Sequence, residues 1–314
     1  MKTGLICDNK FKELVLFDNF RYAITELYPD IIDVNSAEDL PGLDTVFISH
    51  PNHGPNMQVC ARTGFIERCN ELGITLVIFF SEKIGIDKNK KETLYLRGLH
   101  DEFLNYFESL NPILFKDVYS DEDCKFRLFS HLKKANKVII YAYDVDDCEA
   151  FNLKLFRVGM SKYFKYWGDY IPFSERLKSI GFCGSHYKTR LTSIKTIPRN
   201  ISIPCEFIKT RFKSWYAYMA YLAQYQFILS PFGNANGFVS RFYEALTLKA
   251  IIIQQVSSNT LQYYDKESQF KNCIFFENPE EVPSLINKYV IPEERGELWL
   301  EDILSELLQE DNLL

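Results

Sequence analysis

The chain has 314 residues, enough for about two domains of ordinary size. It carries 36 Lys and Arg against 42 Asp and Glu, and the net charge of -6 argues against a general nucleic-acid-binding face, because phosphate binding needs a positive field. A hydrophobic share of 46% excludes a disordered chain, and with 26 Phe and 19 Tyr, aromatic side chains must fill much of the core.

The cysteines and the N-terminus exclude two further classes. None of the eight cysteines belongs to a Cys-x-x-Cys pair or has a companion histidine at metal-ligand spacing, so no zinc site is expected. The N-terminus is charged too early for a signal peptide. No apolar run approaches the roughly 20 residues that cross a bilayer. These features predict a cytoplasmic protein without a membrane span.

Short apolar runs alternate with helix-like stretches in the first half of the chain. Runs rich in β-branched and aromatic residues predict strands over residues 4–7, 31–34, 45–49, 74–80 and 137–143. Apolar residues at helical spacing predict helices over residues 11–27 and 56–72, the second of them ending at Gly73. Alternating strands and helices predict a parallel sheet covered on both faces.

The second half shows the same alternation after a bend at residues 168–172. Strands are expected over residues 179–183, 202–208, 227–230, 251–255 and 273–276. Helices are expected over residues 189–196, 214–224, 239–247, 280–289 and 293–308. The sequence therefore predicts two α/β domains, residues 1–170 and 171–314, with the last helix a candidate to pack back on the first domain.

One candidate site follows the strand at residues 179–183, because ligands of parallel sheets bind beyond the carboxyl ends of the strands. Gly184 and Ser185 form a turn that would expose backbone N–H groups, and Arg190 lies at the start of the next helix. A helix N-terminus with basic residues favours a diphosphate. A plain junction with solvated basic residues explains this segment equally well.

A second candidate site follows the strand at residues 227–230. Glycine is scarce in this chain, with 14 in all, yet the next loop has two glycines and two asparagines, among them Gly233 and Asn234. Ser240 can serve as the N-cap of the following helix.

Arg241 and Glu244 then share one face of this helix, because residues three apart do. A guanidinium suits a diphosphate and a carboxylate suits ribose hydroxyls. A surface ion pair on the helix is the simpler alternative. Polar residues at 254–260 either line the same site or form an ordinary loop.

The order of these segments resembles the donor-site core of GT-B glycosyltransferases, in particular the exostosin-like enzymes and the spore-maturation glycosyltransferase group. The shared pattern is a strand, a glycine-containing loop, an Arg-x-x-Glu-Ala helix and an apolar strand, here at residues 227–253. The segments at residues 180–190 and 273–286 fit as well, so the resemblance covers residues 177–289. A looser resemblance is to the phage DNA β-glucosyltransferase.

The resemblance implies two Rossmann-like parallel-sheet domains facing across a cleft, with residues 1–170 binding the acceptor and residues 171–314 binding the nucleotide sugar. It also implies transfer of a hexose or pentose without a metal cofactor. The donor would be a UDP- or GDP-linked sugar and the acceptor a hydroxyl of a glycan or another molecule. Arg190 and Arg241 would hold the donor diphosphate and Glu244 the ribose. The chain departs from these families at Leu248 and Lys249, where they usually have glycine, and at Asn234 and Asn236, where they often have an acidic or aromatic residue.

Such a reaction needs a base for the acceptor hydroxyl. His50 and His53 lie in one turn directly after the strand at residues 45–49, and histidine is a common base near neutral pH. Glu82, after the strand at residues 74–80, is the competing base. The alternative for the histidine turn is that its imidazoles only cap backbone groups.

Three other functions remain open at this point. A metal-dependent GT-A enzyme would use Asp144 and Asp146, which follow the strand at residues 137–143, although acidic helix caps produce the same pattern. A non-catalytic protein that binds a nucleotide or sugar would use the same site without a base. A DNA-modifying transferase would need a basic acceptor site, which the acidic composition disfavours.

Overall fold

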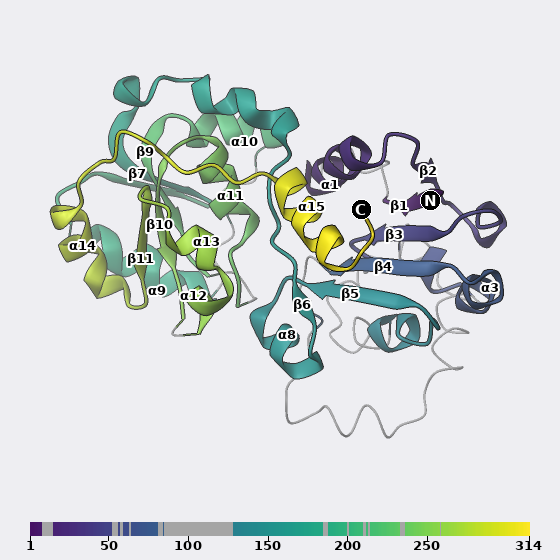
Figure 1. Cartoon of the computed structure of the whole chain (residues 1–314). Helices are drawn as coiled ribbons and strands as arrows, with labels where there is room; N and C mark the ends of the chain where they lie inside the picture. Colours follow the sequence, from purple (N-terminus) through teal and green to yellow (C-terminus); the bar gives the residue numbers. More distant parts are fainter. Residues whose placement is uncertain are drawn as a thin grey trace. The chain divides into compact units, whose positions relative to one another are not determined.

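The computed structural model describes residues 1–7, 15–51, 56, 59–62, 64–80, 84, 128–184, 188–199, 201–209, 212, 214–232, 236–257 and 259–314. Contacts between residues divide the chain into two compact units (Figure 1). The N-terminal unit comprises Met1–Lys12 and Ile24–Phe156, and the C-terminal unit comprises Glu13–Ala23 and Arg157–Leu314. The chain thus changes unit after Phe156, earlier than the boundary at residue 170 that the sequence led us to expect.

The N-terminal unit is built on a sheet of six parallel strands in the order β2-β1-β3-β4-β5-β6. The five strands expected from the sequence are present, and only the two-residue β6 was not expected. The strands are β1 (Thr3–Ile6), β2 (Ile32–Asp33), β3 (Thr45–Ser49), β4 (Thr75–Phe80), β5 (Val138–Ala142) and β6 (Lys154–Leu155). The helices that the structure describes from end to end in this unit are α1 (Val15–Leu27, shared with the other unit), η1 (Ala37–Asp39), α3 (Phe65–Leu72) and α8 (Val145–Phe151).

The C-terminal unit has a sheet of five parallel strands in the order β11-β10-β9-β7-β8. The strands are β7 (Leu177–Cys183), β8 (Cys205–Ile208), β9 (Tyr225–Ser230), β10 (Ile251–Gln255) and β11 (Cys273–Phe276). Its α-helices are α9 (Lys188–Thr196), α10 (Trp215–Leu222), α11 (Ser240–Thr247), α12 (Thr260–Tyr263), α13 (Asp265–Ser268), α14 (Val282–Lys288) and α15 (Leu300–Glu310). Four 3-10 helices complete it: η2 (Lys162–Asp169), η3 (Phe173–Glu175), η4 (Ile197–Arg199) and η5 (Pro279–Glu281).

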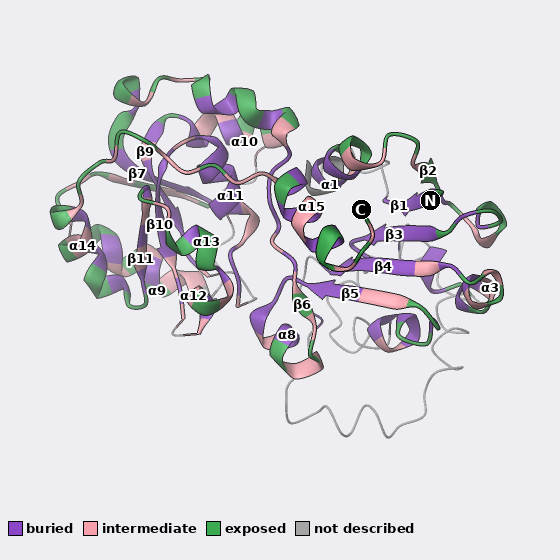
Figure 2. Cartoon of the chain, in the orientation of Figure 1, coloured by how far each residue is buried: buried purple, intermediate pink, exposed green. Residues whose placement is uncertain are grey.

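The prediction of two α/β parts with parallel sheets is confirmed. Central strands such as β3 are buried along their whole length, as Figure 2 shows, because helices cover both faces of a parallel sheet. Numbered from its own first strand, each sheet begins 2-1-3-4-5, the doubly wound order of flavodoxin-like folds. The strand order reverses between β1 and β3 in one sheet and between β7 and β9 in the other. The carboxyl ends at such a reversal are where doubly wound folds bind ligands.

Two predicted helices differ from the expectation. Residue 56 is helical as expected, but the helix expected over residues 56–72 is interrupted, and α3 begins anew at Phe65 after Gly64, which has a φ of 84°. Gly73 ends α3 as expected. The helix expected from residue 293 begins at Leu300. Residues before it are held extended by other elements, since the Arg295 guanidinium stacks 3.8 Å from the centroid of the Phe173 ring and Leu300 N donates to Met160 O.

The helix α15 belongs to the C-terminal unit. Its Glu301 carboxylate accepts hydrogen bonds from the Ser161 hydroxyl and the Lys162 amide.

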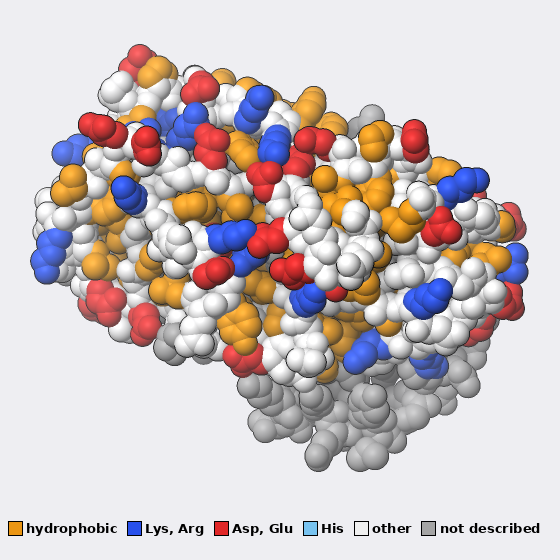
Figure 3. Space-filling model, in the orientation of Figure 1, with side chains coloured by type: hydrophobic (Ala, Val, Ile, Leu, Met, Phe, Trp, Pro, Cys, Tyr) orange, Lys and Arg blue, Asp and Glu red, His pale blue; other side chains and the backbone are white. Residues whose placement is uncertain are grey.

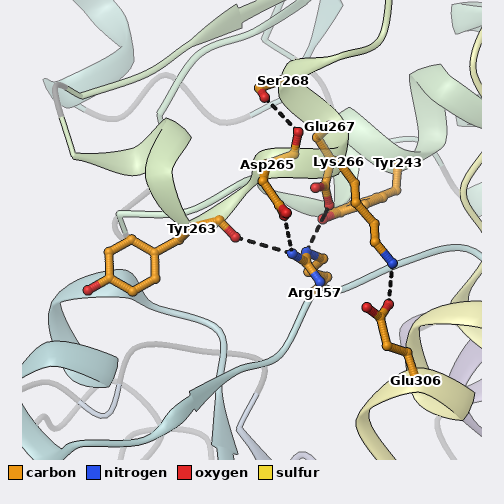
Figure 4. A network of polar contacts seen from close by, with 8 residues as sticks. All are labelled: Arg157, Tyr243, Tyr263, Asp265, Lys266, Glu267, Ser268 and Glu306. Atoms are coloured by element: carbon orange, nitrogen blue, oxygen red, sulfur yellow. Dashed lines mark hydrogen bonds and ion pairs between the residues drawn. The ribbon is translucent and has the colours of Figure 1, made fainter.

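A second polar network surrounds Arg157, the first residue of the chain after it returns to the C-terminal unit (Figure 4). Arg157 Nη2 donates to Asp265 Oδ1 at 3.0 Å, and Arg157 Nε lies 3.3 Å from the buried Glu267 carboxylate.

Tyr243 of α11 donates to the same Glu267 carboxylate at 2.9 Å, and Lys266 pairs with Glu306 of α15. The network therefore ties α11, α13 and α15 to the residue where the C-terminal unit resumes.

No helix in the described part of the chain is long and apolar enough to cross a membrane.

Candidate functional site at the carboxyl ends of β7 and β9

The reversal of strand order in the C-terminal sheet lies between β7, which ends at Cys183, and β9, which ends at Ser230. Two arginines from different helices reach this place. Arg241 of α11 donates from Nη2 to Cys183 O at 2.7 Å, and Arg190 of α9 donates from Nε to Phe232 O at 3.0 Å. The structure thus brings to one edge of the sheet the two arginines that the sequence assigned to a diphosphate, and each of them donates to a backbone carbonyl.

Arg241 is buried with only part of its hydrogen-bonding capacity used. Its side chain is 8% exposed, and its guanidinium carbon lies 4.6 Å from the centroid of the Phe182 ring. Within the described residues, Arg241 Nε has no hydrogen-bond partner. Glu244, on the same helix, interacts with the guanidinium electrostatically, but no ion pair joins the two side chains. A buried cation that keeps an unused N–H can accommodate an anionic ligand.

Gly184 makes room for this arginine. Its φ of 151° is unfavourable for any residue with a side chain, and a Cβ there would lie 2.6 Å from Arg241 Nη2. Its amide, however, donates to Ile208 O at 3.2 Å. The expectation of an exposed backbone donor at Gly184 is therefore wrong, because the pairing of the ends of β7 and β8 uses that N–H. Ser185, the second residue of the expected turn, lies outside the described residues.

Two buried polar side chains lie at the ends of the neighbouring strands. Ser230 and Gln254 are paired in register on β9 and β10, and both are 0% exposed. In the part of the chain that the structure describes, Ser230 Oγ and Gln254 Oε1 have no hydrogen-bond partner. Buried polar atoms are nearly always satisfied, so an unsatisfied pair at the same edge of the sheet as Arg241 is typical of a place where a ligand or ordered water binds.

The sequence did not single out Ser230, although a polar residue closing an apolar strand is a usable signal. Gly233 and Asn234 of the following loop lie outside the described residues. Ser240 is the first residue of α11 and not its N-cap. That position belongs to Val239, whose backbone is extended and whose carbonyl accepts from Phe242 N at 2.9 Å.

Glu244 shares the buried face of α11 with Arg241, as the spacing predicted, but other side chains already hold its carboxylate. Trp215 Nε1 donates to Oε1 at 3.0 Å, and the Tyr218 hydroxyl donates to Oε2 at 2.8 Å. Burial raises the pKa of Glu244, while Arg241 and these two donors oppose the rise. The pKa of Tyr218 is also raised, by burial and then by Glu244, with Arg241 acting against it. Sequence reasoning did not point to Trp215 or Tyr218 as partners of Glu244.

In the N-terminal unit, His50 lies at the carboxyl end of β3, which is one of the two strands at the reversal of that sheet. It is 2% exposed and has a φ of 51°, rare for a residue with a side chain. Ser49 Oγ contacts His50 Nδ1, and Asn56 Nδ2 donates to Ser49 O at 2.7 Å. The first contact orients the imidazole, and the second holds the backbone next to it. His53 and Glu82, the other two candidate bases, lie outside the described residues.

The segment with Asp144 and Asp146 begins the helix α8. The Asp144 carboxylate is the N-cap and accepts from Asp147 N at 3.0 Å, and the Asp147 carboxylate accepts from Ile84 N at 2.5 Å. The interpretation of this segment as a helix cap is confirmed. In the described ranges, no group of three or more His, Cys, Asp or Glu is placed to hold a metal ion.

A cavity of about 560 Å³ lies at the opposite edge of the C-terminal sheet, where β7 and β10 begin. It is lined by Gly168, Asp169, Pro172, Phe173, Arg176, Lys249, Glu293, Glu294, Arg295 and Glu297. None of the residues that the sequence assigned to the site lines this cavity, and its acidic and basic groups are mixed. The unsatisfied buried groups, and not this cavity, identify the candidate site.

No family model matches the chain, and no curated protein sequence matches it. Among solved structures, one similar chain is CalG4, the calicheamicin glycosyltransferase, with 8% identity over 97% of this chain and 80% of that chain, and a TM-score of 0.33. Another is a two-component system response regulator/GGDEF domain protein, with 10% identity over 98% of this chain and 99% of that chain, and a TM-score of 0.23. Neither score is high enough to carry an argument about fold or function.

Proposed function

We propose that the chain is a glycosyltransferase of the GT-B kind that binds a nucleotide-sugar donor at the carboxyl edge of its C-terminal sheet. The observation that carries the proposal is the state of Arg241. A buried guanidinium without an ion pair among the described residues lies where a doubly wound sheet binds ligands, beside the unsatisfied Ser230 and Gln254.

Each side chain at this edge has a role that its chemistry allows. Arg241, through its unused Nε, and Arg190 bind the diphosphate, which matches a guanidinium in charge and geometry. Glu244 accepts the ribose hydroxyls, because each carboxylate oxygen accepts one hydrogen bond at present and keeps a further lone pair. Ser185, Gly233 and Asn234 belong to the loops that would complete the donor site.

The sequence pattern supports the same assignment independently. The strand β9, the glycine-containing loop, the Arg-x-x-Glu-Ala helix α11 and the apolar strand β10 follow each other as in exostosin-like and spore-maturation glycosyltransferases. The donor of those families carries a UDP or GDP group.

In the proposed reaction the acceptor oxygen attacks the anomeric carbon of the donor sugar. A new C–O bond forms, the bond between that carbon and the diphosphate breaks, and the diphosphate leaves with the electron pair. The arginines stabilise the leaving group, a task that a divalent cation performs in other enzymes. A base takes the proton of the acceptor hydroxyl, and His50, His53 and Glu82 are the candidates for it.

The main alternative is a protein that binds the same nucleotide sugar without transferring it. Transfer to nucleic acid is less well supported, since acidic and basic side chains of the described residues are interspersed on the face shown in Figure 3 and no broad basic surface is seen there.

The experiment combines a thermal-shift screen of UDP- and GDP-sugars with a transfer assay in excess EDTA. A donor at 100 times its Kd should raise the free energy of unfolding by about 2.7 kcal/mol. The donor found in this way should then be consumed in the presence of saccharide acceptors, with or without EDTA. Loss of activity in EDTA and its recovery with Mn²⁺ would contradict metal-independent transfer. Binding without turnover on any acceptor would favour the binding protein.

A further inference from the structure

The exposed aromatic side chains of the described residues gather in one part of the C-terminal unit. All of them are tyrosines, and each is at least 39% exposed: Tyr22, Tyr163, Tyr166, Tyr170 and Tyr216. We call this group the tyrosine platform. Its members come from α1, from η2 and the residue after it, and from α10. Large exposed aromatic groups of this kind are uncommon on a protein surface that binds nothing.

Buried aromatic rings connect the members of the platform. Trp167 contacts three of them, with ring centroids 5.6 Å from Tyr166, 4.8 Å from Tyr170 and 6.4 Å from Tyr216. Tyr22 and Tyr163 stack on each other at 4.2 Å with an interplanar angle of 15°. Because buried neighbours limit their rotation, the rings form a surface that costs little entropy to order on binding.

The platform is continuous with the proposed donor site. Trp215 lies between the two regions, with its ring centroid 6.0 Å from Trp167 and 5.0 Å from Phe164, the neighbour of Tyr163. The same Trp215 donates from Nε1 to the Glu244 carboxylate at 3.0 Å. A molecule bound on the platform would therefore lie next to the residues that we assign to the donor.

The charges around the platform are largely cancelled. Lys162 pairs with Asp302 at 2.8 Å, and Asp169 lies 3.6 Å from Lys249. Lys165 adds one exposed cation. A single-stranded nucleic acid also stacks on aromatic rings, but it needs a basic groove along its backbone. The near-neutral surroundings favour an uncharged ligand.

A neutral saccharide fits this chemistry. One face of a pyranose ring is lined by C–H groups and packs on an aromatic ring, while its hydroxyls need hydrogen-bond partners. Tyrosine offers both a ring and a polar group. In the described part of the chain, the hydroxyls of Tyr163, Tyr170 and Tyr216 make no hydrogen bond, so they are available to such a ligand.

We propose that the tyrosine platform binds the acceptor, and that this acceptor is an uncharged saccharide chain whose sugar rings stack on the tyrosines. The proposal rests on the proposed function and deepens it, because it names the acceptor class and the surface that holds it. Trp215 and Glu244 then lie at the junction between the acceptor and the donor.

The test uses an array of neutral gluco-, manno- and galacto-oligosaccharides, with an oligo-dT strand of matched length as the competing probe. The first variant is the combined Tyr166→Ala, Tyr170→Ala and Tyr216→Ala change, and the second changes the same three residues to Phe. Val290→Ser, at a side chain that is 84% exposed, is the control for loss of an apolar surface group elsewhere.

The full chain should bind at least one neutral oligosaccharide, and the alanine variant should lose about tenfold or more in affinity. The phenylalanine variant should keep most of the affinity because it retains the rings, and Val290→Ser should not differ from the natural protein. No oligosaccharide binding, binding that is unchanged in the alanine variant, or preference for oligo-dT would overturn the proposal.

Calorimetry with UDP and GDP on the same variants separates the two proposals. If the platform proposal alone fails, nucleotide binding persists and saccharide binding does not depend on the tyrosines. If the donor site alone fails, saccharide binding still depends on the tyrosines although no nucleotide binds. Nucleotide binding that matches the natural protein also shows that the alanine variant is folded.

Discussion

The two edges of the C-terminal sheet each hold a buried arginine, and the two arginines differ in how they are satisfied. At the amino edge, Arg176 is 4% exposed and donates to three carbonyls: Ile171 O at 2.9 Å, Leu248 O at 2.6 Å and Gly168 O at 3.3 Å. At the carboxyl edge, Arg241 is 8% exposed and donates to Cys183 O, while its Nε has no partner within the described residues.

This difference separates a structural arginine from one that is ready to bind a ligand. Arg176 joins the segments before β7 and β10, and burial together with nearby Arg295 lowers its pKa to about 10, so it stays charged at neutral pH. Burial alone therefore does not identify a functional residue. The hydrogen bonds that a buried group leaves unmade are the more informative property.

The largest expected effect concerns the carboxyl edge of the other sheet. If His50 is the base, His50→Asn should lower turnover by roughly 10²–10⁴, the usual contribution of general base catalysis, and leave nucleotide binding in place. Steady-state kinetics with a saturating donor measures the effect. Asn retains a polar side chain at a buried position, which limits the structural cost.

His53→Asn and Glu82→Gln are the matched controls for this prediction. Both should leave turnover within a few-fold of the natural protein if His50 is the base. Should Glu82→Gln abolish turnover while His50→Asn stays active, the carboxylate is the base and the contacts of His50 with Ser49 are structural.

The next effect tests the amino edge. Arg176→Ala should lower the free energy of unfolding by about 2–4 kcal/mol, because three buried carbonyls lose their donor. Urea denaturation gives the value. Arg68→Ala removes a half-buried arginine whose ion pair in the described part of the chain is with Glu71, three residues away, and it should cost no more than about 0.5 kcal/mol. An Arg176→Ala protein as stable as the Arg68→Ala protein would erase the distinction between the two edges.

Much of the fold could be predicted from the sequence because its strands are strongly apolar. The ranges 45–49, 251–255 and 273–276 match β3, β10 and β11, since buried parallel strands read as continuous β-branched and aromatic runs. The start of α15 could not be predicted. The preceding residues have helical spacing, but the stacking of Arg295 on Phe173 and the bond from Gly296 N to Asn272 Oδ1 hold them extended.

The candidate site was predicted in part. Spacing placed Arg241 and Glu244 on one face of a helix, and the position of Gly184 directly after a predicted strand drew attention to it. The partners Trp215 and Tyr218 could not be found in this way, because they come from α10 and meet Glu244 only through the packing of two helices. Nor does a sequence show which donors are satisfied, and that property distinguishes Arg241 from Arg176.

Calorimetric titration of Arg241→Ala with UDP and GDP tests the central claim most directly. Removing the guanidinium should weaken binding of the preferred nucleotide by about 1.5–3 kcal/mol, the range for a charged hydrogen bond, or about 10- to 150-fold in Kd. The free energy of unfolding should change much less than in Arg176→Ala, because fewer bonds are lost. Nucleotide binding equal to that of the natural protein, in a titration that detects the natural protein's binding, would contradict the account.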